Sequence, residues 1–491
     1  MTLTVWMAAA ESAPLATTGG LGDVLRALPG ALARRGARVR RLLPGYGRID
    51  RAGFALEGEI LAVPLGPARV PVRFRSRREP DGVVTTLVEC DEMFARDGIY
   101  GPPGGEFDDN LRRYILLSRA VCEFAASAPD RPDLLHLHDW HTAPVPILLR
   151  AAPRIRHRPP TVLTVHNIGY QGRGGADEAD WLSLDPENLA RLMRPEILED
   201  GGGINLLKAG LALADRLTAV SPTYAREIQT AELGFGLDPF ARRRAADLVG
   251  ILNGLDEAVW NPLTDRHIAA PYGPESLAGK EASRRALRSR FGLADDDRPI
   301  VGVVSRLVHQ KGIDLVLGAA GRILAAGGTL VVLGSGDRDL ETGLDRLRQE
   351  HPGRAGVLIG YDEPLSHLVV AGSDLLLVPS RYEPCGLTQM YALRYGTVPV
   401  VRRTGGLADT VVDEGHDNGR GTGFLFDHPT SDDLARAVAR ALDRRRGPAE
   451  SWKSLQARGM RQDFSWDRAA SAYLDLYRDV LETGRRTPPP L

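Results

Sequence analysis

The chain contains little cysteine, and what it contains does not suit a disulfide framework or a metal site. Cys90, Cys122 and Cys385 lie far apart without metal-like spacing, and three thiols cannot all pair with one another. Because disulfides are rare in reducing compartments, we expect a cytoplasmic protein. No run approaches the roughly 20 apolar residues of a membrane span. The first strand-like run begins at Leu3, so a removable leader does not fit.

The chain also lacks a surplus of either charge. Its 491 residues include 62 basic and 63 acidic ones. Binding to nucleic acid or to an anionic membrane surface requires a basic surplus, so we predict neither as a partner. The length exceeds one ordinary hydrophobic core and predicts two domains. Nothing in the composition indicates an oligomeric state.

Short apolar runs alternate with longer amphipathic ones along the chain, which predicts an α/β fold with parallel sheets buried on both faces. The first series of predicted strands comprises Leu3–Ala9, Val39–Leu43, Val83–Val88, Leu134–Leu137, Val162–Val165, Leu217–Val220 and Leu248–Ile251. The second comprises Ile300–Val304, Leu330–Leu333, Val357–Ile359, Leu375–Val378 and Val398–Val401. Residues 51–90 hold short alternating stretches with Gly and Pro, which indicate a hairpin-like insertion.

A Pro- and Gly-rich break at residues 261–279 separates the two series and is typical of a linker. We therefore predict two doubly wound, Rossmann-like domains that face a central cleft, at residues 1–260 and 261–465. Residues 466–491 are predicted to form a helix followed by a frayed tail.

Polar residues and glycines follow the predicted strands in both halves, where ligands of open α/β sheets bind. They are Glu11 together with TGGL at 18–21, HDWH at 138–141, HNIGYQG at 166–172, Asn253, SRLVHQKG at 305–312, EPCGLTQ at 383–389 and a second TGGL at 404–407. Each alone is compatible with a helix cap or a tight turn, but seven such groups at strand ends indicate a binding site. We expect each Gly-Gly turn to open a helix and to offer N–H groups to a ligand, with Gly20 near a phosphate.

The second half provides the groups that a nucleotide sugar needs. Arg306 and Lys311 can embrace a diphosphate, although a surface pair near a helix start is the alternative. Glu383 can accept sugar hydroxyls, and the N–H groups of Gly386–Thr388 can bind phosphate oxygens. Two cations make a metal unnecessary, so we predict no metal and no cofactor. His138, His141 and His166 are compatible with a metal group, but Asn167 and Tyr170 nearby favour hydrogen bonds to a polyol.

These motifs resemble those of the bacterial glycogen synthases and plant starch synthases, family 5 of the retaining glycosyltransferases. The resemblance spans nearly the whole chain and rests on TGGLGDV, LLPGYG, HDWH, TVHNIGYQG, LLKAG, AVSPTYAREI, GILNGLD, SRLVHQKG and PSRYEPCGLTQMYALRYGTVPVVRRTGGLADTV. Family 4 enzymes show E-x7-E where this chain has Glu383 followed by Tyr391, which favours family 5.

The resemblance implies transfer of glucose from ADP-glucose, with UDP-glucose as the alternative donor, to the nonreducing 4-hydroxyl of an α-1,4-glucan such as glycogen, with retention. It also implies a C-terminal helix that crosses back to the first domain. The implied catalytic residues are His166, Arg306, Lys311 and Glu383. The implied donor-binding residues are Thr17, Gly19, Gly20, Asp139, Asn253, Cys385, Gly386, Leu387 and Thr388. The implied acceptor-binding residues are Glu11, Asp23 and Tyr100.

Three departures from the family pattern leave alternatives open. Thr17 stands where relatives have lysine, the glycines of LEDGGGIN predict a looser loop, and Ser283-Arg284 replaces Asn-Lys. A weakened glucan-binding or regulatory homologue is therefore one alternative. The other is a different nucleotide-sugar enzyme of the same architecture, such as a sugar epimerase or a maltose-1-phosphate-forming transferase.

Overall fold

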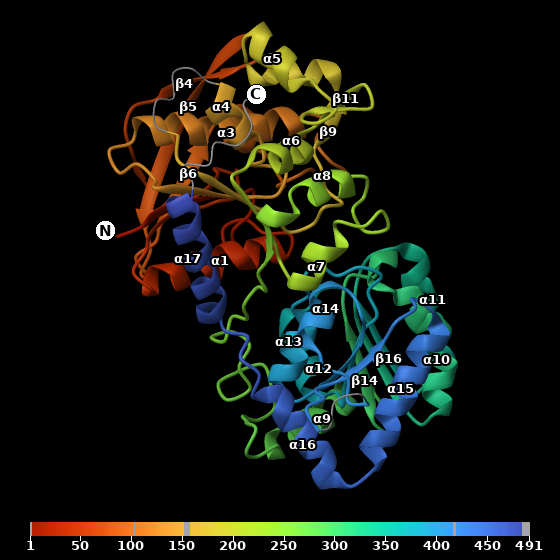
Figure 1. Cartoon of the computed structure of the whole chain (residues 1–491). Helices are drawn as coiled ribbons and strands as arrows, with labels where there is room; N and C mark the ends of the chain where they lie inside the picture. Colours follow the sequence, from red (N-terminus) through yellow and green to blue (C-terminus); the bar gives the residue numbers. More distant parts are fainter. Residues whose placement is uncertain (1, 103, 152–157, 416–418, 484–491) are drawn as a thin grey trace. The chain divides into compact units, whose positions relative to one another are not determined.

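The computed structural model describes residues 2–102, 104–151, 158–415 and 419–483, and the chain divides into two compact units (Figure 1). Unit 1 comprises the chain up to Gly254 together with the segment from Trp466 onward, and unit 2 comprises Leu255–Ser465. The tail predicted to be frayed, residues 485–491, lies outside the described residues. Within the described residues, no helix is both long and apolar enough to cross a membrane.

Unit 1 is built on a large sheet. Its described strands are β1 (Thr4–Ala8), β2 (Arg38–Pro44), β3 (Ala55–Leu56), β4 (Leu61–Leu65), β5 (Ala68–Arg78), β6 (Val84–Glu89), β7 (Leu134–His138), β8 (Thr161–Val165), β12 (Arg216–Ala219) and β13 (Leu248–Gly250). They follow the order β13-β12-β8-β7-β1-β2-β6-β5-β3, with β4 beside β5. Strands β13 to β6 pair in parallel, whereas β3, β4, β5 and β6 are joined by antiparallel pairs. The hairpin predicted within residues 51–90 is thereby confirmed.

Helices cover both faces of this sheet. They are α1 (Gly20–Arg34), α2 (Asp91–Phe94), α3 (Asn110–Ser127), α4 (Pro144–Ala151), α5 (Pro186–Leu192), α6 (Leu206–Leu213), α7 (Pro222–Glu227), α8 (Asp238–Arg243) and α17 (Trp466–Thr483), with short 3-10 turns at Ala176–Leu182 and Ala245–Asp247. A small antiparallel sheet joins β9 (Arg173–Gly175), β10 (Glu199–Asp200) and β11 (Gly203–Asn205).

The alternation of side chains along β1 explains how the layers form, because successive residues of a strand point to opposite faces. Val5 and Met7 pack into one apolar cluster with α1 and α17. Trp6 points to the other face, where its ring lies 5.2 Å from Phe124 of α3. Figure 1 shows α17 in dark blue beside α1 in red, although the two helices are separated by most of the sequence.

Unit 2 is a second parallel sheet between two helical layers. Its strands are β14 (Ile300–Val304), β15 (Thr329–Gly334), β16 (Ala355–Ile359), β17 (Leu375–Val378), β18 (Val398–Arg402) and β19 (Phe424–Phe426). Its helices are α9 (Ala278–Phe291), α10 (Ile313–Ala325), α11 (Arg338–Glu350), α12 (Glu363–Gly372), α13 (Thr388–Arg394), α14 (Gly405–Thr410), α15 (Ser431–Arg446) and α16 (Ala449–Met460), with a 3-10 turn at His309–Lys311.

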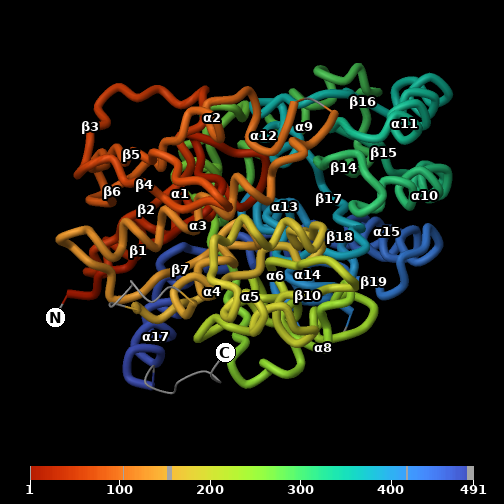
Figure 2. The backbone as a smooth tube through the Cα atoms, turned by 90° about the horizontal axis from the view of Figure 1, so that it is seen from above, coloured from red at the N-terminus to blue at the C-terminus, as the bar shows by residue number. Residues whose placement is uncertain are grey.

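The strands of unit 2 follow the order β16-β15-β14-β17-β18-β19, and all neighbours pair in parallel (Figure 2). Apolar residues of α10 and α15 pack on one face, and those of α9 and α12 pack on the other. The short edge strand β19 was not predicted. Its three residues form too brief a run to be distinguished from a loop by sequence pattern alone.

The segment predicted as a linker, residues 261–279, is instead packed onto unit 2. Asp265 accepts hydrogen bonds from His367 Nδ1 at 2.7 Å and from the Tyr395 hydroxyl at 2.6 Å. Tyr272 is buried, and its hydroxyl donates to the Tyr395 carbonyl at 2.9 Å. The Pro and Gly residues thus mark an irregular segment, while its aromatic and acidic side chains fix it in place.

Candidate active site

Glu11 organises the first Gly-Gly loop of unit 1. It follows β1 and is almost fully buried. Its carboxylate accepts from the backbone N–H groups of Thr18 at 2.6 Å and Gly19 at 3.2 Å, and from the Thr18 hydroxyl at 2.8 Å. The Tyr100 hydroxyl donates to the same carboxylate at 2.6 Å. The predicted acceptor-side residues Glu11 and Tyr100 therefore meet the predicted donor loop.

These contacts change the interpretation of the loop. The N–H groups of Thr18 and Gly19 already have an acidic partner, so they do not form an open phosphate cradle as expected. Gly20 begins α1, and a Cβ at Gly19 or Gly20 would meet no heavy atom within 4 Å. The Thr17 side chain is exposed, and Arg48 Nη2 donates to the Thr17 carbonyl at 3.4 Å. Space and a nearby cation thus remain at the loop.

His138, Asp139 and His166 form a second group at the ends of β7 and β8. The side chain of Asp139 accepts from the backbone N–H of His166 at 2.7 Å and from that of Asn167 at 3.3 Å. His138 Nδ1 lies 2.9 Å from His166 Nε2. Asp139 has a φ of 57°, a left-handed conformation that is uncommon outside glycine and often occurs at functional sites.

Burial keeps these histidines neutral, because desolvation disfavours the charged form. It lowers the pKa of His136, His141 and His166 to about 3 and that of His138 well below its ordinary value. His138 and His141 are enclosed, whereas His166 keeps accessible surface. The sequence predicted that all three would bind a polyol, and the enclosure of His138 and His141 contradicts this for those two. No group of three or more His, Cys, Asp or Glu in the described residues suits a metal ion.

The remaining predicted residues of unit 1 lie at the ends of its elements. Asp23 stands in the first turn of α1, where a negative charge is favourable. Asn253 follows β13, is nearly buried, and its Oδ1 has no hydrogen-bond partner within the described structure. No hydrogen bond joins Asn253 to the Glu11 or the His166 group in the described residues.

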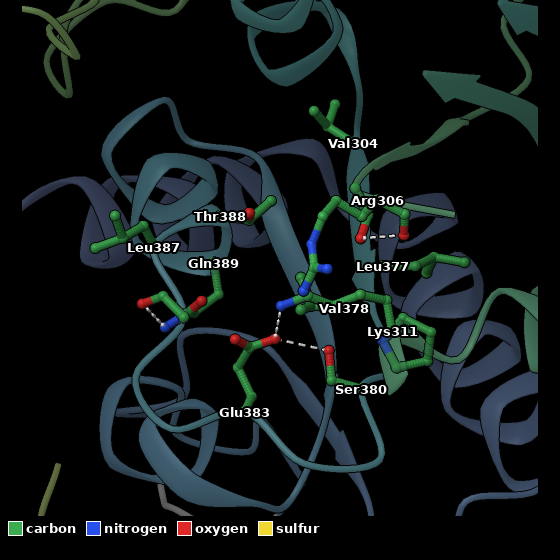
Figure 3. A pocket seen from close by; sticks show the side chains of 13 residues that line it. Val304, Arg306, Lys311, Leu377, Val378, Ser380, Glu383, Leu387, Thr388 and Gln389 are labelled. Carbon is green, nitrogen blue, oxygen red and sulfur yellow. Dashed lines mark hydrogen bonds and ion pairs between the residues drawn. The ribbon is translucent and has the colours of Figure 1, made fainter. Parts of the chain in front are cut away.

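Unit 2 contains a cavity of about 150 Å³ at the carboxyl ends of β14 and β17 (Figure 3). The residues that line it are Val304, Ser305, Arg306, Lys311, Leu377, Val378, Pro379, Ser380, Glu383, Gly386, Leu387, Thr388 and Gln389. The two predicted cations, the predicted carboxylate and the predicted N–H loop therefore share one cavity. Cys385, also predicted, is buried beside them and carries a thiol rather than a disulfide.

Lys311 and Glu383 form an ion pair. Lys311 Nζ lies 2.6 Å from Glu383 Oε2, which also accepts from the Ser380 hydroxyl at 2.8 Å; Figure 3 shows both contacts. The side chains of Lys311 and Glu383 are 21% and 8% exposed, so the pair is partly desolvated. Among the described residues Oε1 of Glu383 has no partner, which leaves it available to accept a hydrogen bond.

Arg306 contributes a second cation, which pairs with no carboxylate in the described residues. It is exposed, and its Nη2 donates to Gln310 Oε1 at 3.3 Å. No ion pair of Arg306 occurs in the described part of the chain. A guanidinium in this state is suited to a bidentate contact with a phosphate.

The second TGGL serves a different purpose from the first. A Cβ at Gly405 would lie 1.9 Å from the Glu383 carbonyl, and one at Gly406 would lie 2.0 Å from the Cys385 carbonyl. Gly406 N–H donates to the Glu383 carbonyl at 3.1 Å. The paired glycines thus let α14 approach the loop that carries Glu383, which corrects the expectation that both repeats offer N–H groups to a ligand.

Two of the departures have structural explanations. The LEDGGGIN glycines form a tight turn between β10 and β11, where Gly201 and Gly202 have positive φ, so the loop is not loose as predicted. Arg284 is buried and its Nε bonds Asp374 Oδ2 at 3.3 Å, which is a packing contact.

Sequence reasoning missed Tyr361. It follows β16, and the residue is 86% exposed although it is aromatic. It lies after the strand end, at the same edge of the sheet as Arg306 and Glu383. An exposed aromatic ring at a ligand-binding edge is the signal that would have identified it.

Two doubly wound parallel sheets, each with polar groups at the carboxyl ends of its strands, define the GT-B class of glycosyltransferases. Residues 4–243 match the starch synthase catalytic domain model, and residues 285–458 match the model of group 1 glycosyl transferases. The chain belongs to the family of bacterial glycogen synthases and starch synthases.

Its relatives cover nearly the whole chain. A glycogen synthase of Alkalilimnicola ehrlichii is 47% identical over 96% of this chain and 98% of its own. Glycogen synthase 1 of Rhizobium meliloti is 44% identical over 97% and 99%. The catalytic domain of starch synthase IV from Arabidopsis thaliana, bound to ADP and acarbose, superposes with a TM-score of 0.88 at 34% identity over 98% of this chain and 99% of that one.

Proposed function

We propose that this chain transfers glucose from ADP-glucose to the nonreducing 4-hydroxyl of an α-1,4-glucan, with retention. The observation that carries the proposal is the cavity of unit 2, where Arg306, Lys311 and Glu383 converge. Two cations suit the diphosphate of the donor, and a carboxylate oxygen without a protein partner suits a sugar hydroxyl. A purely glucan-binding protein has no need for leaving-group cations.

Arg306 and Lys311 stabilise the diphosphate as it departs. Cleavage of the bond between glucose C1 and the phosphate oxygen leaves positive charge on the sugar and negative charge on the leaving group. Cations fixed in advance stabilise the growing negative charge most in the transition state, and this lowers the barrier. The backbone of Gly386–Thr388, which lines the same cavity, offers further N–H groups to phosphate oxygens.

Glu383 orients the donor glucose. Its Oε2 is occupied by Lys311 and Ser380, so Oε1 accepts a hydrogen bond from the sugar, at the 3-hydroxyl by resemblance. Glu383 is the one carboxylate among the residues that line the cavity. A double displacement uses two carboxylates about 5 Å apart. We therefore favour attack on the face that the diphosphate leaves, with the acceptor O4 bonding to C1 while its proton passes to the leaving phosphate.

The residues of unit 1 serve the glucose and the acceptor. His166 is neutral and partly accessible, so it can donate to a sugar hydroxyl without adding charge near the anomeric carbon. Asp139 fixes the backbone of His166 through its N–H. Glu11 and Tyr100, joined at 2.6 Å, hold the first Gly-Gly loop and are proposed to contact the acceptor together with Asp23.

The choice of ADP-glucose over UDP-glucose is supported by one structural neighbour and by Tyr361. The starch synthase IV neighbour was obtained with ADP. An exposed aromatic ring offers a stacking platform to a base, and stacking contributes about 1–3 kcal/mol per base. A purine presents the larger face, so we expect Tyr361 to favour ADP. A cytoplasmic location is proposed because the three cysteines carry thiols rather than disulfides, as is usual in reducing compartments.

Incubation with glycogen and either ADP-[14C]glucose or UDP-[14C]glucose tests the function. We expect label in the polymer with ADP-glucose, less with UDP-glucose, and release of labelled maltose by an enzyme specific for α-1,4 bonds. The Glu383→Gln variant is the matched control, because it keeps the shape of the side chain and removes its charge. Absence of label with both donors would overturn the proposal.

A further inference from the structure

The contact between His138 and His166 involves a single proton. The two ring nitrogens, His138 Nδ1 and His166 Nε2, are 2.9 Å apart. In a neutral imidazole one nitrogen is a donor and the other an acceptor. Either His138 donates and His166 keeps its own proton on Nδ1, or His166 donates from Nε2 and its Nδ1 is bare. The two arrangements present opposite hydrogen-bonding groups to anything that contacts the accessible side of His166.

The surroundings of His138 decide between these arrangements. His138 Nε2 is buried and has no hydrogen-bond partner in the described structure. If His166 were the donor, the proton of His138 would have to sit on this nitrogen, which would leave a buried N–H without an acceptor. Orphaned buried N–H groups are rare in native proteins, whereas under-satisfied acceptors are more common. The arrangement in which His138 donates from Nδ1 is therefore favoured.

The ring of His138 is held so that this donation persists. The Thr142 hydroxyl accepts from the backbone N–H of His138 at 2.7 Å and donates to its carbonyl at 3.1 Å. The ring packs on His136 with centroids 4.2 Å apart. His136 is itself fixed by the Tyr477 hydroxyl at 2.7 Å and by the Thr164 hydroxyl at 2.6 Å. Rotation of the His138 ring would therefore disturb a buried hydrogen-bonded layer.

We infer that His138 is a positioning residue that keeps the proton of His166 on Nδ1, so that His166 presents an N–H donor to a hydroxyl of the donor sugar. This inference rests on the proposed function. Residues 138 and 139 then hold His166 at two points, since Asp139 binds its backbone N–H and His138 binds its ring. His138 takes no part in a bond-making or bond-breaking step and acts through His166.

The Asn and Asp variants of His138 form a matched test. Both are nearly isosteric, and either can place an atom close to the position of Nδ1. The amide of His138→Asn can still donate to His166 Nε2, whereas the carboxylate of His138→Asp, which is ionised in an assay at alkaline pH, can only accept. Loss of one oriented donor costs about 10²–10³-fold in kcat. We therefore expect the kcat of the Asp variant to be at least about tenfold below that of the Asn variant, while KM for glycogen stays alike.

A purely structural role predicts another result, because Asn and Asp would then lower kcat equally. Equal kcat values in two folded variants would overturn the inference. Nitrogen NMR of the wild-type protein labelled with 15N-histidine gives a reading that needs no variant at position 138. We expect a protonated Nδ1 and a bare Nε2 for His166, assigned by the signal lost in His166→Gln. A proton on Nε2 would overturn the inference, whereas an inactive wild type with the expected spectrum would overturn only the proposed function.

Discussion

The substitution Lys311→Met tests the leaving-group site most directly. Methionine keeps much of the length of the side chain and removes the charge. A charge-assisted hydrogen bond is worth about 1.5–3 kcal/mol, and loss of a preorganised group that stabilises transition-state charge costs about 10²–10³-fold in kcat. Because the Lys311–Glu383 pair is largely shielded from solvent, the effect should lie in this range. We expect kcat/KM for ADP-glucose to fall by about 10²–10³-fold.

The same substitution has a predictable cost in stability. It leaves the nearly buried Glu383 carboxylate with Ser380 as its partner, and a buried group that loses a partner costs about 1–3 kcal/mol. Lys311 is one-fifth exposed, so we expect the lower part of this range, measured as a shift of a few degrees in the thermal midpoint. The protein should remain folded at the assay temperature.

Initial rates at limiting and saturating donor, with glycogen in excess, separate kcat from KM. Lys453→Met is the matched control, because Lys453 is 57% exposed and its one ion pair in the described residues is with the exposed Glu450. Surface pairs of this kind contribute about 0–1 kcal/mol, so the control should keep the wild-type rate. A folded Lys311→Met protein with kcat/KM within about threefold of wild type would refute the assignment of Lys311 to the diphosphate.

Three further predictions concern the repeated glycines, the missing lysine and Asp139. Gly406→Ala should lower the thermal midpoint and the rate, because its Cβ would meet the Cys385 carbonyl and overpacking costs about 1–3 kcal/mol. Gly20→Ala has open space around its Cβ and should leave the thermal midpoint unchanged. Equal midpoints for the two variants would contradict the distinction between the two TGGL loops. Thr17→Lys should lower KM for donor or glucan by about tenfold, and unchanged kinetics would indicate that another group, with Arg48 as candidate, fills that role. Burial raises the pKa of Asp139 to about 7, so the folded state retains a proton that the unfolded chain releases above about pH 4. The free energy of unfolding of wild type relative to Asp139→Asn should therefore fall between about pH 5 and 7, by up to about 1.4 kcal/mol per pH unit. A difference that does not change with pH would count against the raised pKa of Asp139.

Sequence pattern predicts the strands well where a buried run is long and flanked by turn residues. Ile300–Val304 and Leu375–Val378 coincide with β14 and β17. The pattern fails where tertiary contacts decide the outcome. Residues 261–279 have the composition of a linker, yet Asp265 and Tyr272 anchor them to unit 2. Neither contact has a local signature, since each partner lies about 100 residues or more away in the sequence.

The candidate site shows the same division. Strand-end position and residue type predicted that Arg306, Lys311 and Glu383 belong together, and they line one cavity. The pattern did not predict that Lys311 and Glu383 would pair, nor that Glu11 would occupy the N–H groups of the first Gly-Gly loop. Identical tetrapeptides have different neighbours, because the tertiary fold determines what approaches a glycine. Only the second TGGL is pressed against another backbone segment.

The place of α17 in unit 1 bears on how the chain folds as it is synthesised. Residues of this helix, among them Tyr473 and Tyr477, complete the apolar cluster that covers β1 and α1. Ribosomes deliver the N-terminal part of a chain first, and domains generally fold as units. Here β1 leaves the ribosome early, but its covering helix is made only after all of unit 2. An apolar face of the first unit therefore stays uncovered until the last helix is synthesised. Nascent chains halted before Trp466 should consequently be prone to aggregation and should engage chaperones.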